Sequence, residues 1–68
     1  MIDLKKYWHL NNKQVTVVCI DGDSITGEWI DWTSEQDNEP DPESITVIRS
    51  DGAPIEIYIN EIKEIQGI

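Results

Sequence analysis

The sequence is poor in several residue types on which common classes of protein depend. Its 68 residues include no phenylalanine, one methionine and one cysteine, Cys19. A single cysteine excludes an internal disulfide framework, and an unpaired thiol is typical of the reducing cytoplasm, where we expect this protein. No stretch approaches the ~20 apolar residues of a membrane span, and Met1–Lys6 lacks the apolar run of a signal peptide. We therefore expect no membrane association.

Basic residues are also scarce. Five Lys and Arg residues stand against 14 Asp and Glu residues, so the formal net charge is −9. This charge repels phosphate backbones and anionic lipids, which argues against general nucleic-acid or membrane-surface binding. The length allows one small domain (residues 1–68), which buries roughly 60% of the surface of the unfolded chain. Because so thin a core leaves little space for a catalytic cleft, we predict a protein that is not an enzyme and holds no cofactor.

The first residues predict a short α-helix over 3–10. Asp3 can cap it by accepting hydrogen bonds from the free amides of the first turn. Leu4, Tyr7 and Trp8 follow at positions i, i+3 and i+4, which places them on one apolar stripe. A helix of this length is not stable alone, so we expect the stripe to pack on the rest of the protein.

Five strands are predicted from runs of β-branched and apolar residues, at 13–20, 25–33, 44–49, 55–59 and 62–66. Asp21-Gly22 and Asp51-Gly52 are hairpin signals, and Gly27 inside the second strand is typical of a bulge or a tight bend. One helix followed by five short strands predicts a mainly β fold, a small closed barrel of the SH3-like or OB-like kind.

The stretch 34–43 has the composition of a linker. It contains no apolar residue, two prolines and five acids, Glu35, Asp37, Glu39, Asp41 and Glu43. Because nothing in it can be buried, we predict a solvated, mobile loop.

The acids lack the spacing of a calcium-binding EF-hand, and His9 and Cys19 lack the further ligands of a zinc site. We therefore predict no metal, with Cys19 in the core and His9 on the surface.

Two stretches resemble the Sm-like (LSm) family. Val15–Gly22, continuing through Ile25–Trp29, is similar to the first Sm motif, which runs apolar-x-apolar-x-apolar-x-Asp-Gly and then x-Gly-x-apolar. Trp32 matches the aromatic residue that follows in the same strand, and Ile57–Ile65 is similar to the second Sm motif at the spacing of its last strands. The resemblance implies an N-terminal helix on a strongly bent, five-stranded, Sm-like barrel.

The resemblance also implies self-association. Members of the family close into rings by pairing the fourth strand of one copy with the fifth strand of the next. Strand edges with unpaired N–H and C=O groups can do the same here, and pairing would extend a small core. The residues of the candidate interaction surface are Trp32, Tyr58, Ile57, Ile59, Ile62 and Ile65.

The positions that bind RNA in the family are where this sequence departs from it. The aspartate of the first motif falls on Thr33, and the Arg-Gly pair of the second motif falls on Tyr58-Ile59. The asparagine near the base has only a loose counterpart in Asn38 because the acidic loop intervenes. RNA binding is therefore the disfavoured alternative. If it occurs, the candidate contacts are Trp32, Asn38, Tyr58 and Asn60.

The three tryptophans allow a core and a binding interpretation. We expect Trp29 to fill the barrel and Trp8 to dock the helix over its open end. Trp32 and Tyr58 are the pair that can form an aromatic cage for a peptide or a methylated lysine, and for Trp32 the core remains an equal alternative. We predict a non-enzymatic protein-interaction module that forms homo-oligomers through its edge strands. A further alternative is an acidic DNA mimic that inhibits a DNA-binding enzyme.

Overall fold

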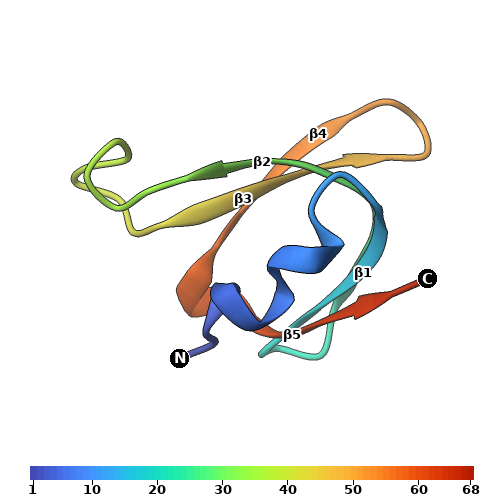
Figure 1. Cartoon of the computed structure of the whole chain (residues 1–68), viewed down its shortest axis with the longest axis horizontal. Helices are drawn as coiled ribbons and strands as arrows, with labels where there is room; N and C mark the ends of the chain where they lie inside the picture. Colours follow the sequence, from blue (N-terminus) through green and yellow to red (C-terminus); the bar gives the residue numbers. More distant parts are fainter.

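The computed structural model describes all 68 residues as one antiparallel sheet of five strands behind a short N-terminal helix (Figure 1). The strands are β1 (Gln14–Cys19), β2 (Ser24–Thr33), β3 (Ser44–Arg49), β4 (Pro54–Tyr58) and β5 (Ile62–Gly67). Two 3₁₀-helices complete the fold, η1 (Leu4–Leu10) and η2 (Ile59–Glu61). The predicted mainly β class, the five strands and the N-terminal helix are confirmed.

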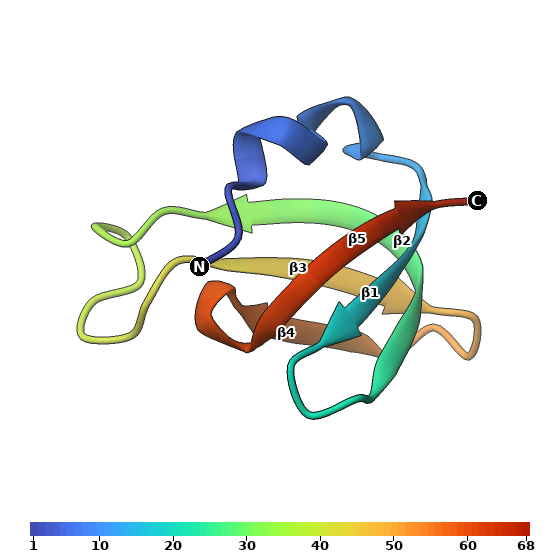
Figure 2. The same cartoon turned by 90° about the horizontal axis from the view of Figure 1, so that it is seen from below.

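The sheet is open, so the prediction of a closed barrel is wrong. Its strand order is β4-β3-β2-β1-β5, and every neighbouring pair is antiparallel. The sheet curls strongly, so that β1 and β5 cross over β3 and β4 in Figure 2. No ladder of hydrogen bonds joins β4 to β5, because β4 pairs only with β3 and β5 only with β1. The fold therefore keeps two free edges.

The N-terminal helix η1 is a 3₁₀-helix and not the expected α-helix. Asp3 caps it as predicted, with Oδ1 accepting a hydrogen bond from the Lys5 amide at 3.1 Å. The side chains that pack on the core are Leu4, Tyr7 and Leu10, a spacing of three. A 3₁₀-helix has three residues per turn, so this spacing places all three on one face, which a short α-helix does not.

No helix of the fold combines the length and the apolar character needed to cross a membrane.

The core lies between the curled sheet and η1. Trp29 is its largest fully buried side chain, as the sequence predicts, and its indole Nε1 donates a hydrogen bond to the Asp31 carbonyl at 3.0 Å. The other buried apolar residues are Leu4, Val15, Val17, Cys19, Ile45, Val47, Ile57, Ile59, Ile62 and Ile65.

The glycines of β2 and of the hairpins have separate structural reasons. Gly22 and Gly52 have φ angles of 95° and 85°, the left-handed region that Asp-Gly hairpins require, so both predicted hairpins are confirmed. Gly27 is buried against β3: a Cβ at this position would lie 2.2 Å from the Ile48 carbonyl oxygen. The bulge of β2 lies instead between Trp29 and Asp31. Gly27 is therefore required for the close approach of two strands.

Candidate functional site

The bulge in β2 decides which way Trp32 points. Trp29 pairs with Val47 of β3, and Trp32 pairs with Ile45, both on the inner face of the sheet. In a regular strand, residues three apart point to opposite faces. The extra residue at the bulge moves Trp32 to the same side as Trp29, which is the side covered by η1.

Trp8 and Trp32 meet there as a pair of perpendicular indole rings. Their centroids are 5.9 Å apart with an interplanar angle of 84°, and the two side chains remain 48% and 40% exposed. Trp8 also lies edge-on to Trp29, at 5.9 Å and 89°. The expected docking of η1 by Trp8 is therefore observed, but the ring keeps an accessible surface.

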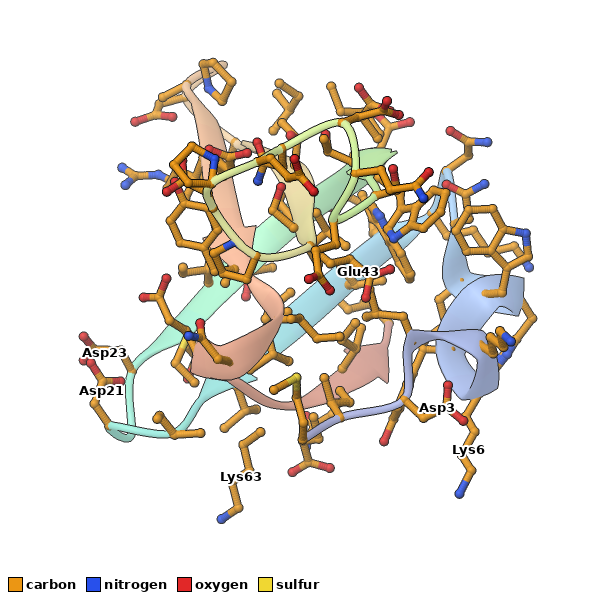
Figure 3. The ribbon with its side chains drawn as sticks, turned by 90° about the vertical axis from the view of Figure 1, so that its left-hand side faces the viewer. Asp3, Lys6, Asp21, Asp23, Glu43 and Lys63 are labelled. Atoms are coloured by element: carbon orange, nitrogen blue, oxygen red, sulfur yellow. The ribbon has the colours of Figure 1, made fainter.

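A carboxylate completes this site. Oε2 of Glu43 accepts a hydrogen bond from Nε1 of Trp32 at 2.5 Å, and the Glu43 carbonyl accepts one from the Ile59 amide at 2.8 Å. Figure 3 shows Glu43, the last residue of the acidic loop, on the side of the loop toward η1. Together these groups enclose a groove of about 290 Å³, lined by Leu4, Lys5, Trp8, Trp32 and Glu43. We call it the Trp8–Trp32 groove.

The bulge also separates Trp32 from Tyr58. Tyr58 pairs with Ser44, so it lies on the outer face of the sheet, whereas Trp32 shares the inner face with Ile45. The predicted aromatic pair is therefore not brought together. Each ring instead contacts the acidic loop, Trp32 through Glu43 and Tyr58 through a long hydrogen bond of 3.5 Å from its hydroxyl to Asp41 Oδ2.

Most of the acidic loop is exposed, as predicted, but hydrogen bonds that the sequence did not indicate join it to the sheet. The half-buried side-chain amide of Asn38 donates to the Pro42 carbonyl at 2.7 Å and to Ser44 Oγ at 3.4 Å. Ser44 is fully buried and donates from its hydroxyl to Glu56 Oε2 at 2.7 Å. Asn38 was predicted only as a candidate RNA contact, and in the sequence its one distinguishing feature is an amide within a run of carboxylates.

Tyr58 should ionise only at unusually high pH. The nearby charge of Asp41, followed by that of Glu56, raises the pKa of its phenol above the usual value. Because the folded pKa exceeds the unfolded one, ionisation of the phenol opposes folding, and stability falls as the pH rises from the unfolded pKa through the folded pKa. We expect the Asp41→Asn variant to lower the pKa of Tyr58, measured by ultraviolet titration of the phenolate. An unchanged titration curve would contradict the contact with the loop.

Four isoleucines of the predicted interaction surface belong to the core. They are between 3% and 9% exposed and comprise Ile57, Ile59, Ile62 and Ile65. Three of them lie on the edge strands β4 and β5, and Ile59 lies on η2 between these strands. All four side chains belong to the buried core. This part of the surface is therefore corrected: within one copy these side chains are buried, and the unpaired part of each edge is its backbone.

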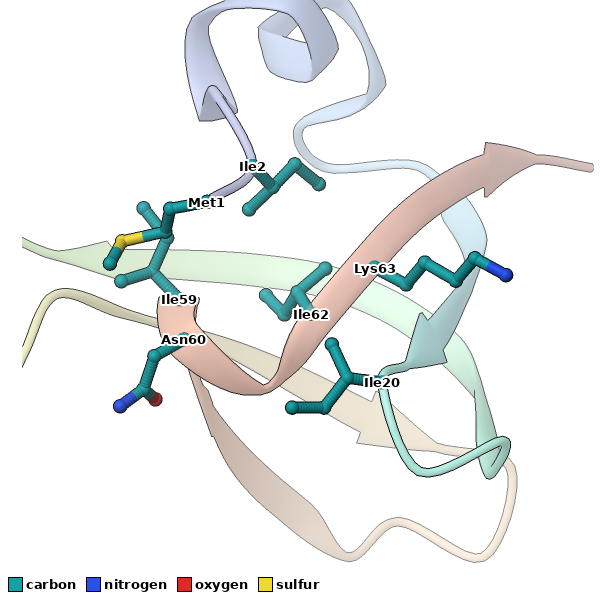
Figure 4. Close-up of a pocket in the computed structure, with 7 residues that line it drawn as sticks. All are labelled: Met1, Ile2, Ile20, Ile59, Asn60, Ile62 and Lys63. Atoms are coloured by element: carbon teal, nitrogen blue, oxygen red, sulfur yellow. The ribbon is translucent and has the colours of Figure 1, made fainter.

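An apolar depression lies beside the start of β5. It is lined by Met1, Ile2, Ile20, Ile59, Asn60, Ile62 and Lys63 (Figure 4). Ile20, the first residue after β1, is 68% exposed, which is unusual for a large apolar side chain in so polar a sequence. Asn60, the last candidate RNA contact, is exposed on η2 at this depression. It therefore lies by the β5 edge, whereas Asn38 is held inside the acidic loop.

The remaining polar clusters do not form a reactive site. Cys19 is buried, as predicted, and burial together with the charges of Asp21, Glu61 and Asp23 raises the pKa of its thiol, which leaves little thiolate at neutral pH. No three His, Cys, Asp or Glu side chains come together as metal ligands. The acids are spread over the loop, the hairpin tip with Asp21 and Asp23, and the β3–β4 turn with Asp51. Figure 3 shows Asp21 and Asp23 well apart from Glu43.

Comparisons of the chain with protein-family models, with curated proteins and with solved structures find no match. The geometry described above is therefore the basis for the function proposed below.

Proposed function

We propose that the protein is a non-enzymatic, Sm-like interaction module that self-associates through its two sheet edges. The observation that carries the proposal is the open sheet, which leaves β4 at one edge and β5 at the other. Unpaired edge strands offer rows of backbone N–H and C=O groups to another chain. The motifs at Val15–Gly22 and Ile57–Ile65 support the Sm-like assignment, and the strand order agrees with a small curled sheet of this kind.

The two edges are also compatible in their side chains. Ile55 and Ile57 lie on the inner face of β4, and Ile62 and Ile65 lie on the inner face of β5. If β4 of one copy pairs with β5 of the next, the inner apolar rows continue from one sheet into the other. Such head-to-tail contacts close into a ring when the rotation between copies permits it.

The charge of the protein opposes this association. Each copy carries a formal charge of −9, so bringing copies together costs electrostatic free energy that salt reduces. We therefore expect more self-association in about 0.5 M NaCl, where the Debye length is roughly 4 Å, than in dilute buffer. An association driven by exposed ion pairs would show the opposite dependence.

The test is the mass of the protein in solution, measured by sedimentation equilibrium. A concentration of tens of micromolar is enough for interactions of micromolar affinity to appear. The Ile55→Lys variant places a charge on the inner side of the β4 edge, a known means of blocking edge pairing. We expect it to be monomeric where the unmodified protein is oligomeric.

The matched control is Ile30→Lys. Ile30 is 41% exposed and lies in the central strand β2, so the same change of charge is made away from both edges. We expect Ile30→Lys to retain the oligomer. A protein that stays monomeric at high salt, or an oligomer that survives Ile55→Lys, would refute self-association through the edges.

A further inference from the structure

We propose that the Trp8–Trp32 groove binds the side chain of an arginine in a basic segment of another protein. This goes beyond the proposed self-association, because the groove is formed by η1, β2 and the acidic loop and includes neither edge strand. Three features of the groove carry the inference: its aromatic walls, its carboxylate and its size.

Both aromatic walls are accessible, and each is held by a contact within the protein. The rings of Trp8 and Trp32 stand at 84° to one another. Trp8 packs edge-on against Trp29, and Trp32 donates a hydrogen bond to Glu43. The face of an indole attracts a cation, and the attraction is about 0.5–2 kcal/mol depending on exposure. Because both rings are already held in place, little conformational entropy is lost when a ligand binds.

The carboxylate of Glu43 favours arginine among the possible cations. Its Oε2 atom accepts from Trp32, and no protein donor contacts its Oε1 atom. A planar guanidinium can stack on an indole and donate to a carboxylate oxygen at the same time. An ammonium group is more strongly hydrated, and a trimethylated lysine has no N–H to donate. Arginine is therefore the side chain whose chemistry matches both indole rings and the carboxylate of Glu43.

The size and the surrounding charge indicate a peptide. A groove of about 290 Å³ lies at the lower limit for a small-molecule site and suits a single side chain. The remaining acids of the loop, from Glu35 to Asp41, lie next to Glu43 in the chain and attract further basic residues of the segment. Lys5 is the one cation that lines the groove.

A second copy of this chain is a poor occupant. It carries one arginine, Arg49, whose guanidinium already contacts Asp51 at 2.9 Å within the β3–β4 turn. Neither neighbour of Arg49 in the sequence is basic, because Ile48 precedes it and Ser50 follows it. The groove therefore fits a partner of opposite net charge.

The experiment is a titration with short peptides. The probe is a capped glycine-serine peptide with one central arginine flanked by two lysines, and the matched peptide carries citrulline, which has the shape of arginine without its charge. Binding is followed by the indole N–H signals in nitrogen–proton correlation spectra. We expect the Trp8 and Trp32 signals to shift more than that of buried Trp29, and the citrulline peptide to bind at least about tenfold more weakly.

Three variants test the contacts without a large change in the fold. Glu43→Gln keeps an oxygen for the Trp32 indole but removes the charge, and we expect about tenfold weaker binding. Glu39→Gln removes one charge from the same loop away from the groove, and we expect less than about a twofold change. Trp32→Ala should also abolish the shift of the Trp8 signal.

Four results would overturn the proposal. They are no indole shift at millimolar peptide, equal binding of the citrulline peptide, equal losses in Glu43→Gln and Glu39→Gln, and tighter binding when trimethyllysine replaces the central arginine. The third would indicate attraction by net charge alone, and the fourth a cage for methylated lysine. Ile55→Lys should bind the peptide normally, so a failure of self-association leaves this test unaffected.

Discussion

Replacing Trp29 with alanine is expected to destabilise the protein by about 3–5 kcal/mol, the range for removing a buried aromatic side chain. Trp29 is 0% exposed, is the largest fully buried side chain, and supports Trp8 from below. A domain of this length has a total stability of roughly 3–10 kcal/mol. The substitution therefore removes a large share of the stability, and we expect a much lower urea midpoint, measured by circular dichroism.

Trp32→Ala is the matched control for this prediction. The substitution removes the same number of atoms, but Trp32 is 40% exposed and its ring lines a groove instead of filling the core. We expect a loss of about 1 kcal/mol, which corresponds to one aromatic contact and an exposed hydrogen bond. Similar losses in the two variants would mean that Trp29 is not the centre of the core.

The strands could be predicted from the sequence because their periodicity is local. In β1, the buried residues Val15, Val17 and Cys19 alternate with half-buried Thr16 and Val18, which is the pattern of a strand with one face on a core. The predicted and observed strand ends differ by one residue at most. Hairpins built on Asp-Gly then fix the order of neighbouring strands without information from distant residues.

The type of the N-terminal helix could not be predicted in the same way. Leu4 and Tyr7 fit both an α-helix and a 3₁₀-helix, and the choice depends on whether Trp8 or Leu10 faces the core. The sheet decides this, because Trp29 and Trp32 form a platform on which Trp8 can lie while remaining exposed. A contact across the fold therefore overrode a local pattern.

The candidate site was predicted in part for a similar reason. Trp32 was recognised from its sequence, but its partner was taken to be Tyr58, which is correct only if β2 has no bulge. The bulge moves the side chain of Trp32 from the outer face of the sheet to the inner face, where it contacts Trp8 and Glu43. Gly27 indicated a bulge or a bend in this strand, but the bulge lies further along, between Trp29 and Asp31.

The hydrogen bonds of the acidic loop were also beyond local reasoning. Its composition indicates no burial, yet Asn38 and Ser44 connect it to Glu56 of the edge strand β4. This connection relates the two proposals structurally: the loop that carries Glu43 into the groove is anchored on a strand proposed to pair with another copy. The groove itself includes neither edge strand, so we still expect Ile55→Lys to bind the peptide as the unmodified protein does.

Replacing Gly27 with alanine is the second change expected to have a large effect. An added Cβ would lie 2.2 Å from the Ile48 carbonyl oxygen and 2.8 Å from Cγ1 of Val47. The first of these atoms is backbone, so it can move only if β2 and β3 separate. We expect a loss of about 3 kcal/mol, at the upper end of the usual range for overpacking. Thermal unfolding and proton exchange of the β3 amides would both report it.

Gly67→Ala provides the comparison that isolates this cause. A Cβ at Gly67 would also be too close to another atom, at 2.9 Å, but that atom is Cδ2 of Leu10, the end of a flexible side chain that can rotate away. The same methyl group is added in both variants, and neither glycine has the positive φ angle of Gly22 or Gly52. A loss in Gly27→Ala no larger than that in Gly67→Ala would show that β2 and β3 are not in such close contact at this position.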